Sequence, residues 1–156
     1  MKIEQLNYNL VKIELEHNVM KMSIYGCYAP SDGNNYEYFL DLRRRTLEDE
    51  NDEILLIGDM NTTLCHVMDR WNYQTDNHKK SRAIINNWIS EGEFVDTYRA
   101  FHPETESYTF RKRDVDTRSI LLQARLDYAL TSQKLFGKVL KMIHLSTPYS
   151  MTVGYR

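Results

Sequence analysis

The chain has 156 residues and a formal net charge of −2, which excludes a strongly basic protein that coats nucleic acid along its whole length. Hydrophobic residues make up 42% and aromatic residues 12% of the sequence, which excludes an intrinsically disordered chain. We expect residues 1–156 to form a single domain with a core of its own.

The two cysteines, Cys27 and Cys65, stand alone, so they form neither a zinc motif nor a disulfide framework. We interpret both as reduced thiols of an intracellular protein, with nucleus and cytoplasm both open. The N-terminal segment lacks the apolar core of a signal peptide, and no apolar stretch approaches the roughly 18 residues that cross a bilayer. We therefore expect no membrane partner.

Apolar side chains alternate with polar ones in several segments, and one continuous apolar run ends at Gly58, which together predict strands. Helical spacing predicts two helices, the second with Asp76 or Asn77 as its N-cap and Gly92 as its stop. The predicted strands are 10–16, 20–28, 53–58, 107–113, 125–131 and 138–145, and the predicted helices are 35–49 and 78–91. Such a mixture is typical of a layered α/β domain.

Polar side chains follow the predicted strands, where α/β sheets carry their functional loops. Asp59 comes directly after the buried strand, and Asn61 lies two residues further on. A carboxylate there orients or deprotonates a water or helps to hold Mg²⁺, and an amide donates to a phosphoryl oxygen. The alternative is a turn in which both side chains bind the local backbone.

Two further groups have a functional and a structural interpretation. Asp127 lies two residues after Arg125 on one face of a predicted strand, as a site residue or as half of an ion pair. Arg111 and Arg113 are either solvated strand residues or phosphate contacts.

Seven short segments occur in a fixed order along the chain. They are Tyr28-Ala29-Pro30, Leu56-Ile57-Gly58-Asp59-Met60-Asn61, Asp69-Arg70, Phe94-Val95-Asp96-Thr97-Tyr98-Arg99, His102-Pro103, Tyr108-Thr109-Phe110 and Arg125-Leu126-Asp127-Tyr128. In this order and spacing the chain resembles the endonuclease/exonuclease/phosphatase superfamily, whose fold is DNase I-like. The run from Val95 to Phe110 is most similar to the endonuclease domain of LINE-type (non-LTR) retrotransposons, and abasic-site endonucleases are more distant relatives.

The resemblance implies a four-layer α/β/β/α sandwich and Mg²⁺-dependent hydrolysis of phosphodiesters in DNA. It implies that Asp59 orients the attacking water and contributes to the metal site, and that Asn61 stabilises the phosphate. Tyr28 would contact the scissile phosphate or the leaving oxygen, and Asp127 would support a catalytic histidine. The expected nucleic-acid contacts are Ser31, Arg111 and Arg113.

Two parts of the family pattern have no counterpart in this sequence. In the family, strands bearing an Asn and a metal-ligating Glu precede the Tyr-Ala-Pro segment, so we expect an N-terminal truncation relative to it. The family also ends in Ser-Asp-His, whereas Ser150 is followed by Met151 and Thr152, which replace neither a carboxylate nor an imidazole. We therefore expect a partial sandwich in a degenerate or truncated domain that is inactive alone.

Two alternatives stay open: an active nuclease completed by another chain, and a non-catalytic module that binds nucleic acid or protein. In a partial sandwich, apolar faces would be uncovered along 10–28 and at Val139, Leu140, Ile143 and Leu145. Because uncovered strands promote association, we expect self-association or a partner chain.

Overall fold

The computed structural model describes residues 1–32, 35–73, 76, 78–145 and 150–155, with side chains through residue 142. The strands are β1 (Lys2–Asn7), β2 (Leu10–His17), β3 (Met20–Tyr28), β4 (Ile54–Asp59), β5 (Arg70–Trp71), β6 (Phe94–Asp96), β7 (Phe110–Arg113), β8 (Ile120–Ala124), β9 (Asp127–Ser132), β10 (Val139–Leu145) and β11 (Ser150–Tyr155). The helices are α1 (Asn35–Leu47), α2 (Lys79–Ser90), α3 (Thr97–Phe101) and α4 (Gln133–Phe136).

Six strands form the main sheet in the order β1-β2-β3-β4-β9-β6. The predicted hairpin of β2 and β3 is present, and β3 pairs with β4 in parallel. Ile54, Leu55 and Leu56 are all buried, as the apolar run predicts for a strand covered on both faces. β4 continues through Asp59, which is the last residue of the strand. Pairing with β3 on one side and with β9 on the other fixes its position.

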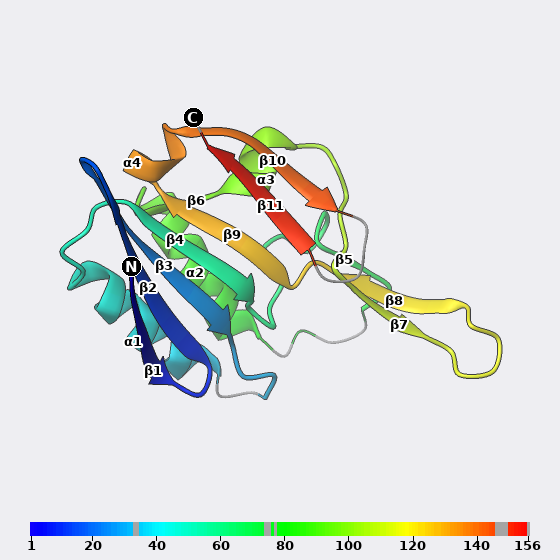
Figure 1. The fold of residues 1–156 in the computed structure, drawn as a ribbon. Helices are drawn as coiled ribbons and strands as arrows, with labels where there is room; N and C mark the ends of the chain where they lie inside the picture. Colours follow the sequence, from blue (N-terminus) through cyan, green and yellow to red (C-terminus); the bar gives the residue numbers. More distant parts are fainter. Residues whose placement is uncertain (33–34, 74–75, 77, 146–149, 156) are drawn as a thin grey trace.

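The main sheet carries α1 and α2 on one face and α3, α4 and β10 over part of the other (Figure 1). On the helix face, Phe39 of α1 and Trp88 of α2 pack over Leu56 in the larger apolar cluster. On the other face, Tyr98 and Met142 belong to a smaller cluster. The layers therefore run from helices through the main sheet to the small β10–β11 sheet, as expected for a partial sandwich.

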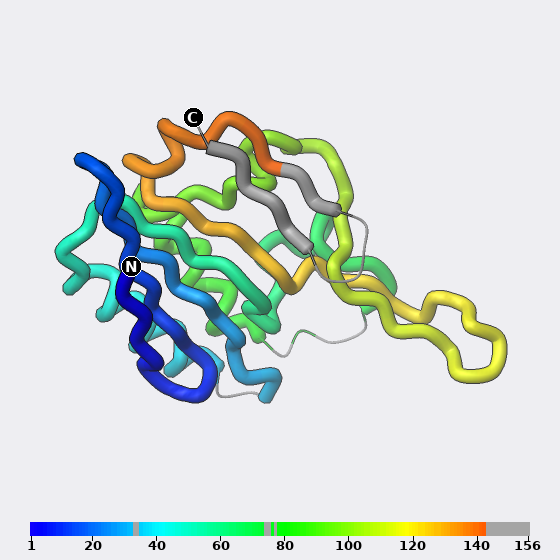
Figure 2. The backbone as a smooth tube through the Cα atoms, viewed as in Figure 1, coloured from blue at the N-terminus to red at the C-terminus, as the bar shows by residue number. Residues whose placement is uncertain are grey.

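The hairpin of β7 and β8 extends away from the body of the molecule (Figures 1 and 2). Together with β5 it forms a three-stranded sheet in the order β5-β8-β7. The strand predicted over 107–113 begins only at Phe110, although the backbone N–H of Thr109 still donates to the carbonyl of Ala124 in β8 at 2.9 Å.

Two local predictions were wrong. The N-cap of α2 is His78, because the Asp76 carboxylate binds Arg82; Asn77 lies outside the described residues. Arg125 lies between β8 and β9, so it does not share a strand face with Asp127. No helix in the described part of the chain is long and apolar enough to cross a membrane. Both cysteines are free thiols.

Candidate functional site

A pocket of about 430 Å³ lies where β3 and β4 end. Three of the predicted catalytic residues, Tyr28, Asp59 and Asn61, line it, and so does the predicted nucleic-acid contact Ser31. The other lining residues are Thr62, Thr63, Arg70, Tyr73, Asp76, His78, Arg82, Phe110 and Leu126. The structure thus gathers in one pocket residues that are far apart in the sequence, from Tyr28 to Leu126.

Asp59 and Asn61 are held by a tight turn that leaves part of each side chain available. The backbone N–H of Asn61 donates to Oδ1 of Asp59 at 2.8 Å, and Asn61 adopts a φ of 45°. One N–H of the Asn61 amide donates to the carbonyl oxygen of Ala29 at 2.6 Å. The turn interpretation therefore applies to Asp59 but not to Asn61, whose side chain binds the backbone of Ala29 instead of its own segment. These contacts fix both polar groups at the pocket.

Asp127 lies beside Asp59 through strand pairing. The two residues are directly opposed in the antiparallel register of β4 and β9, so their side chains point to the same face. The hydroxyl of Thr109 accepts the backbone N–H of Asp127 at 3.1 Å and fixes the start of β9. Asp127 itself does not line the pocket, but its pairing partner Asp59 does.

The electrostatics of the Asp59 carboxylate reflect this placement. Burial raises the pKa of Asp59 above its ordinary value, and the nearby charge of Asp127 raises it further, while the hydrogen bond from the Asn61 backbone lowers it. The negative charge at the end of β4 is therefore only partly compensated by the protein. A cation or a hydrogen-bonded water at this position would stabilise it.

A divalent cation fits Asp59 and Asp127 in part. Adjacent carboxylates are the hard oxygen ligands that Mg²⁺ prefers, and their uncompensated charge favours such an ion. Within the described residues, no group of three or more His, Cys, Asp or Glu side chains is arranged to hold a metal. Mg²⁺ commonly keeps several waters and binds through one or two carboxylates, so the pair is a partial but chemically suitable donor set.

The remaining predicted contacts lie outside the pocket. Arg111 and Arg113 lie on β7 in the projecting hairpin, where their neighbour Phe110 reaches the pocket wall. Nε of Arg111 donates to Gln123 at 2.8 Å, and Nη1 of Arg113 donates to a carbonyl at the hairpin tip at 3.1 Å. These hydrogen bonds connect the two strands and the tip of the hairpin. Both residues are exposed, so their guanidinium groups remain accessible to a ligand.

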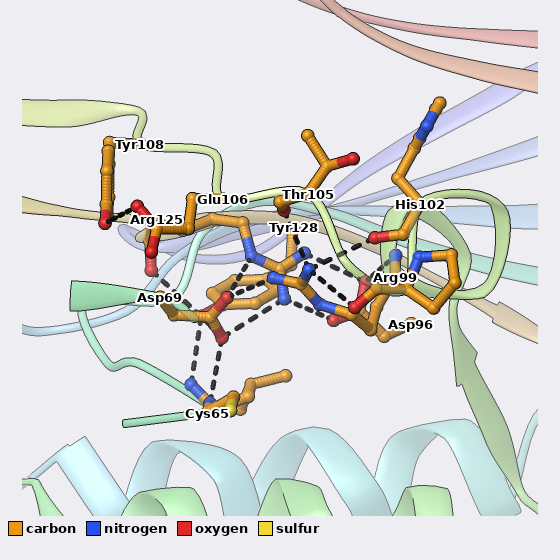
Figure 3. Close-up of polar contacts among 12 residues, drawn as sticks. Cys65, Asp69, Asp96, Arg99, His102, Thr105, Glu106, Tyr108, Arg125 and Tyr128 are labelled. Carbon is orange, nitrogen blue, oxygen red and sulfur yellow. Dashed lines mark hydrogen bonds and ion pairs between the residues drawn. The ribbon is translucent and has the colours of Figure 1, made fainter. Parts of the chain in front are cut away.

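A buried ionic network connects Asp69, Asp96, Arg99 and Arg125 (Figure 3). Arg125 is 2% exposed and donates from Nε to Asp69 at 2.9 Å and from Nη1 to Asp96 at 3.0 Å. Its guanidinium carbon lies 4.4 Å from the ring centroid of Tyr128. Arg99 donates to the same Asp69 carboxylate at 2.7 Å. This pairing replaces the ion pair between Arg125 and Asp127 that the sequence had suggested.

The network joins three segments that are separate in the sequence. Oδ2 of Asp69 accepts the backbone N–H of Cys65 at 2.8 Å, and Nη1 of Arg99 donates to the carbonyl of Thr105 at 2.8 Å (Figure 3). The hydroxyl of Tyr128 accepts the backbone N–H of Leu64 at 3.0 Å. The loop that follows Asn61 is thus fastened to the start of β9, which carries Asp127.

Several pocket residues were missed by sequence reasoning. Arg82 lies in a predicted helix whose polar face looks like an ordinary solvated surface, and Asp76 was interpreted as a helix cap. Arg70 was noticed only as part of the Asp-Arg segment. The prediction for Met151 and Thr152 concerns side chains outside the described part of the structure.

No protein-family model matches the chain. An AP endonuclease from Archaeoglobus fulgidus is similar in structure with a TM-score of 0.68 at 19% sequence identity, over 86% of this chain and 56% of that chain. The 3′ phosphatase NExo from Neisseria, bound to a product DNA hairpin, gives a TM-score of 0.71 at 14% identity, over 98% of this chain and 66% of that chain. The endonuclease domain of TRAS1, a telomere-specific non-LTR retrotransposon, gives 0.66 at 15% identity, over 95% of this chain and 64% of that chain.

These similarities confirm the predicted fold: the chain has the DNase I-like α/β fold of these three structures. It spans 56–66% of their lengths.

Proposed function

We propose that the chain is an endonuclease-like phosphodiesterase domain of the retrotransposon type, which holds a DNA phosphodiester in the pocket at the ends of β3 and β4. The observation that carries the proposal is the meeting of Tyr28, Asp59 and Asn61 in one pocket, with Asp127 beside Asp59. The neighbours of the same fold include an AP endonuclease and a phosphatase bound to a DNA hairpin, which supports DNA as the substrate class.

Each pocket residue has a chemical role in this proposal. The raised pKa of Asp59 favours it as the group that orients a water and accepts its proton. The second N–H of the Asn61 amide donates to a non-bridging oxygen of the phosphate. The exposed phenol of Tyr28 donates to the phosphate or to the leaving oxygen. Asp59 and Asp127 would hold Mg²⁺, which supplies charge stabilisation at the phosphate when bound.

The isolated chain is proposed to be inactive as a nuclease. The family places an Asp and a His after the serine near its C-terminus, and this sequence has Met151 and Thr152 after Ser150. Neither side chain supplies a carboxylate or a proton donor near neutral pH. Loss of one charge-stabilising group typically costs about 10² to 10³ in rate, so loss of both removes most of the catalysis.

A nicking assay on supercoiled plasmid with Mg²⁺ tests this proposal, with Asp59→Ala as the control for a contaminating nuclease. We expect no nicking above that of Asp59→Ala. Mg²⁺-dependent nicking that disappears in Asp59→Ala would contradict inactivity and favour an active enzyme. Restoration of nicking by a second chain, again dependent on Asp59, would favour a site completed in a complex.

A non-catalytic DNA-binding module is the second candidate. The exposed Arg111 and Arg113 on the projecting hairpin favour contact with a nucleic-acid backbone even without hydrolysis. A DNA-binding titration at several salt concentrations, run on the chain and on the double variant Arg111→Gln/Arg113→Gln, distinguishes a DNA-binding module from a degenerate domain that no longer binds DNA. We expect binding that weakens with salt and a shallower salt dependence in the double variant.

A further inference from the structure

A second group of polar residues lines the same pocket as Asp59. Arg70 comes from β5, and Arg82 comes from the beginning of α2. Both approach the carboxylate of Asp76: Nη1 of Arg82 donates to Oδ1 at 2.7 Å, its Nη2 donates to Oδ2, and Nη1 of Arg70 lies 3.8 Å from Oδ1. One carboxylate thus lies between two guanidinium groups inside a pocket.

His66 completes the surroundings of this carboxylate. Its Nε2 lies 3.4 Å from Oδ2 of Asp76, and its Nδ1 lies 2.6 Å from Nη2 of Arg70. Burial and the two arginines, Arg82 and Arg70, lower the pKa of His66, so the ring is neutral at pH 7. The hydrogen bonds from Arg82 lower the pKa of Asp76 to about 2, so the carboxylate is ionised. The cluster therefore carries two positive charges and one negative charge.

The beginning of α2 adds further donors to this part of the pocket. The N-cap residue His78 makes no capping hydrogen bond with its side chain, and the first turn of this 12-residue helix has no acidic residue. Within the described residues, the buried Nδ1 of His78 has no hydrogen-bond partner. An uncapped helix N-terminus attracts anions through its free N–H groups and its dipole.

Arg70 and Arg82 differ from the arginines of an ordinary surface ion pair, because their side chains are mostly buried and border a pocket. The side chain of Arg82 is 11% exposed and that of Arg70 is 19% exposed, and both border the pocket that contains Asp59. A guanidinium fork binds a carboxylate and a phosphodiester with the same two-point geometry. The carboxylate of Asp76 therefore stands where a phosphodiester of the substrate would be recognised.

We propose that Arg82 and Arg70 form a second phosphodiester subsite in this pocket, which Asp76 occupies in the absence of nucleic acid and leaves when a strand binds. The inference rests on the proposed function, since the strand is the one that the proposed site holds by a phosphodiester at Asp59 and Asn61. Asp76 then competes with DNA for the two guanidinium groups. Removing its charge strengthens binding, although the residue itself lines the site.

The test is fluorescence anisotropy of a duplex DNA oligonucleotide over a salt series. Asp76→Asn is expected to lower the dissociation constant by about threefold to tenfold and to leave the slope of the salt dependence close to that of the wild type, because both complexes contain the same phosphate contacts. Arg82→Gln is expected to weaken binding by about tenfold and to make the salt dependence shallower by about one contact. Arg82→Lys keeps the charge but loses the fork, so it should keep the salt dependence and lose affinity.

Asp41→Asn is the matched control. Like Asp76, Asp41 binds two arginines: its carboxylate accepts from Arg44 and Arg45 at 2.7 Å each. Asp41 does not line the pocket. Asp41→Asn changes the net charge by the same amount as Asp76→Asn. Because Asp41 lies outside the pocket, this variant should keep a DNA affinity close to that of the wild type. Equal effects of Asp41→Asn and Asp76→Asn would overturn the subsite while leaving the proposed function intact.

A calorimetric titration with inorganic phosphate distinguishes failure of the two proposals. If the wild-type chain binds no DNA at low salt but Asp76→Asn gains affinity for phosphate that Asp41→Asn lacks, the subsite is supported and DNA as the ligand of the chain is contradicted. If neither DNA nor phosphate responds to Asp76→Asn, the subsite is overturned. Circular dichroism of each variant shows that the fold is retained.

Discussion

Gly58 in β4 is a residue where a side chain does not fit. Its φ is 137°, and a Cβ atom would lie 2.0 Å from the carbonyl oxygen of Cys27 in β3. We predict that Gly58→Ala costs about 3 kcal/mol or more, because strand pairing prevents either backbone from moving away without loss of hydrogen bonds. Urea denaturation followed by circular dichroism measures the loss.

Gly92→Ala is the control for Gly58→Ala. Gly92 also has a positive φ, of 78°, but nothing lies within 4 Å of the position of its Cβ. Only the conformational penalty applies there, roughly 1 kcal/mol. Equal losses in the two variants would show that the close approach of β3 and β4 is not what requires glycine at position 58.

Asp59 is predicted to reduce the stability of the fold at neutral pH. Its folded pKa is raised by burial and by Asp127, so the folded state holds the proton more tightly than the unfolded state. Stability then falls as the pH rises from the unfolded pKa, about 3.9, through the folded pKa, and the cost is fully present above that. Asp59→Asn should therefore raise the free energy of unfolding at pH 7 by roughly 1 kcal/mol.

The pH dependence of that difference provides the check. Denaturant titrations of wild type and Asp59→Asn should converge as the pH falls below the unfolded pKa of about 3.9, where Asp59 is protonated in both the folded and the unfolded state. Asp52→Asn serves as the control, because Asp52 is exposed and only pairs with Lys134 on the surface, so its effect should stay within about 0.5 kcal/mol. A stability gain in Asp59→Asn that does not depend on pH would contradict the linkage.

Sequence reasoning predicted the pocket-lining residues that follow strands but missed those that other elements contribute. Asp59 and Asn61 could be predicted from the sequence, because they follow a continuous apolar run that is typical of a strand buried on both faces. Asp76 and Arg82 lie six residues apart around the start of α2, and nothing in that spacing shows that both border a pocket. Their relation depends on how α2 packs against the sheet, which a single sequence does not encode locally.

At the scale of elements, the turn between β8 and β9 depends on Arg125. Its guanidinium is bound by Asp69 and Asp96 and is 2% exposed. We predict that Arg125→Met costs about 3–5 kcal/mol, because two carboxylates are left buried without their cation. The control is Arg111→Met on β7, whose exposed guanidinium binds only an uncharged partner, Gln123, and which should cost no more than about 0.5 kcal/mol.

Chemical denaturation of the Arg125→Met and Arg111→Met variants measures both losses. A cost below about 1 kcal/mol for Arg125→Met would show that the network contributes little, as happens when a buried ion pair is replaced by well-packed apolar side chains. The sequence pattern had placed Arg125 inside a strand, because Leu126, Tyr128 and Leu130 continue its alternation. In the structure β9 begins only at Asp127, and Arg125 precedes it with its guanidinium bound to Asp69 and Asp96.

At the scale of the whole molecule, the sheet face opposite α1 and α2 is unevenly covered. Met22 and Leu55 are buried under α3, α4 and β10. Towards the edge of the sheet, Ile3, Ile13 and Ile24 lie directly opposite one another on neighbouring strands, so they form one apolar row. Ile3 is 60% exposed, and the other two are partly exposed. The expected uncovered apolar surface along 10–28 thus includes Ile13 and Ile24 of this row. Val139, which was also expected to be uncovered, is buried.

The last prediction is that this row of isoleucines drives self-association of the isolated chain. β1 is also the edge of the main sheet, so an apolar face and an unpaired strand edge meet at Ile3. Ile3→Lys places a charge on the face and should raise the dissociation constant of self-association by about tenfold or more, measured by analytical ultracentrifugation. Val19→Lys makes the same change at the turn between β2 and β3, where Val19 is fully exposed, and should leave association unchanged. A strictly monomeric wild-type chain that unfolds reversibly above about 60 °C would contradict the prediction, because it would show that this face needs no cover.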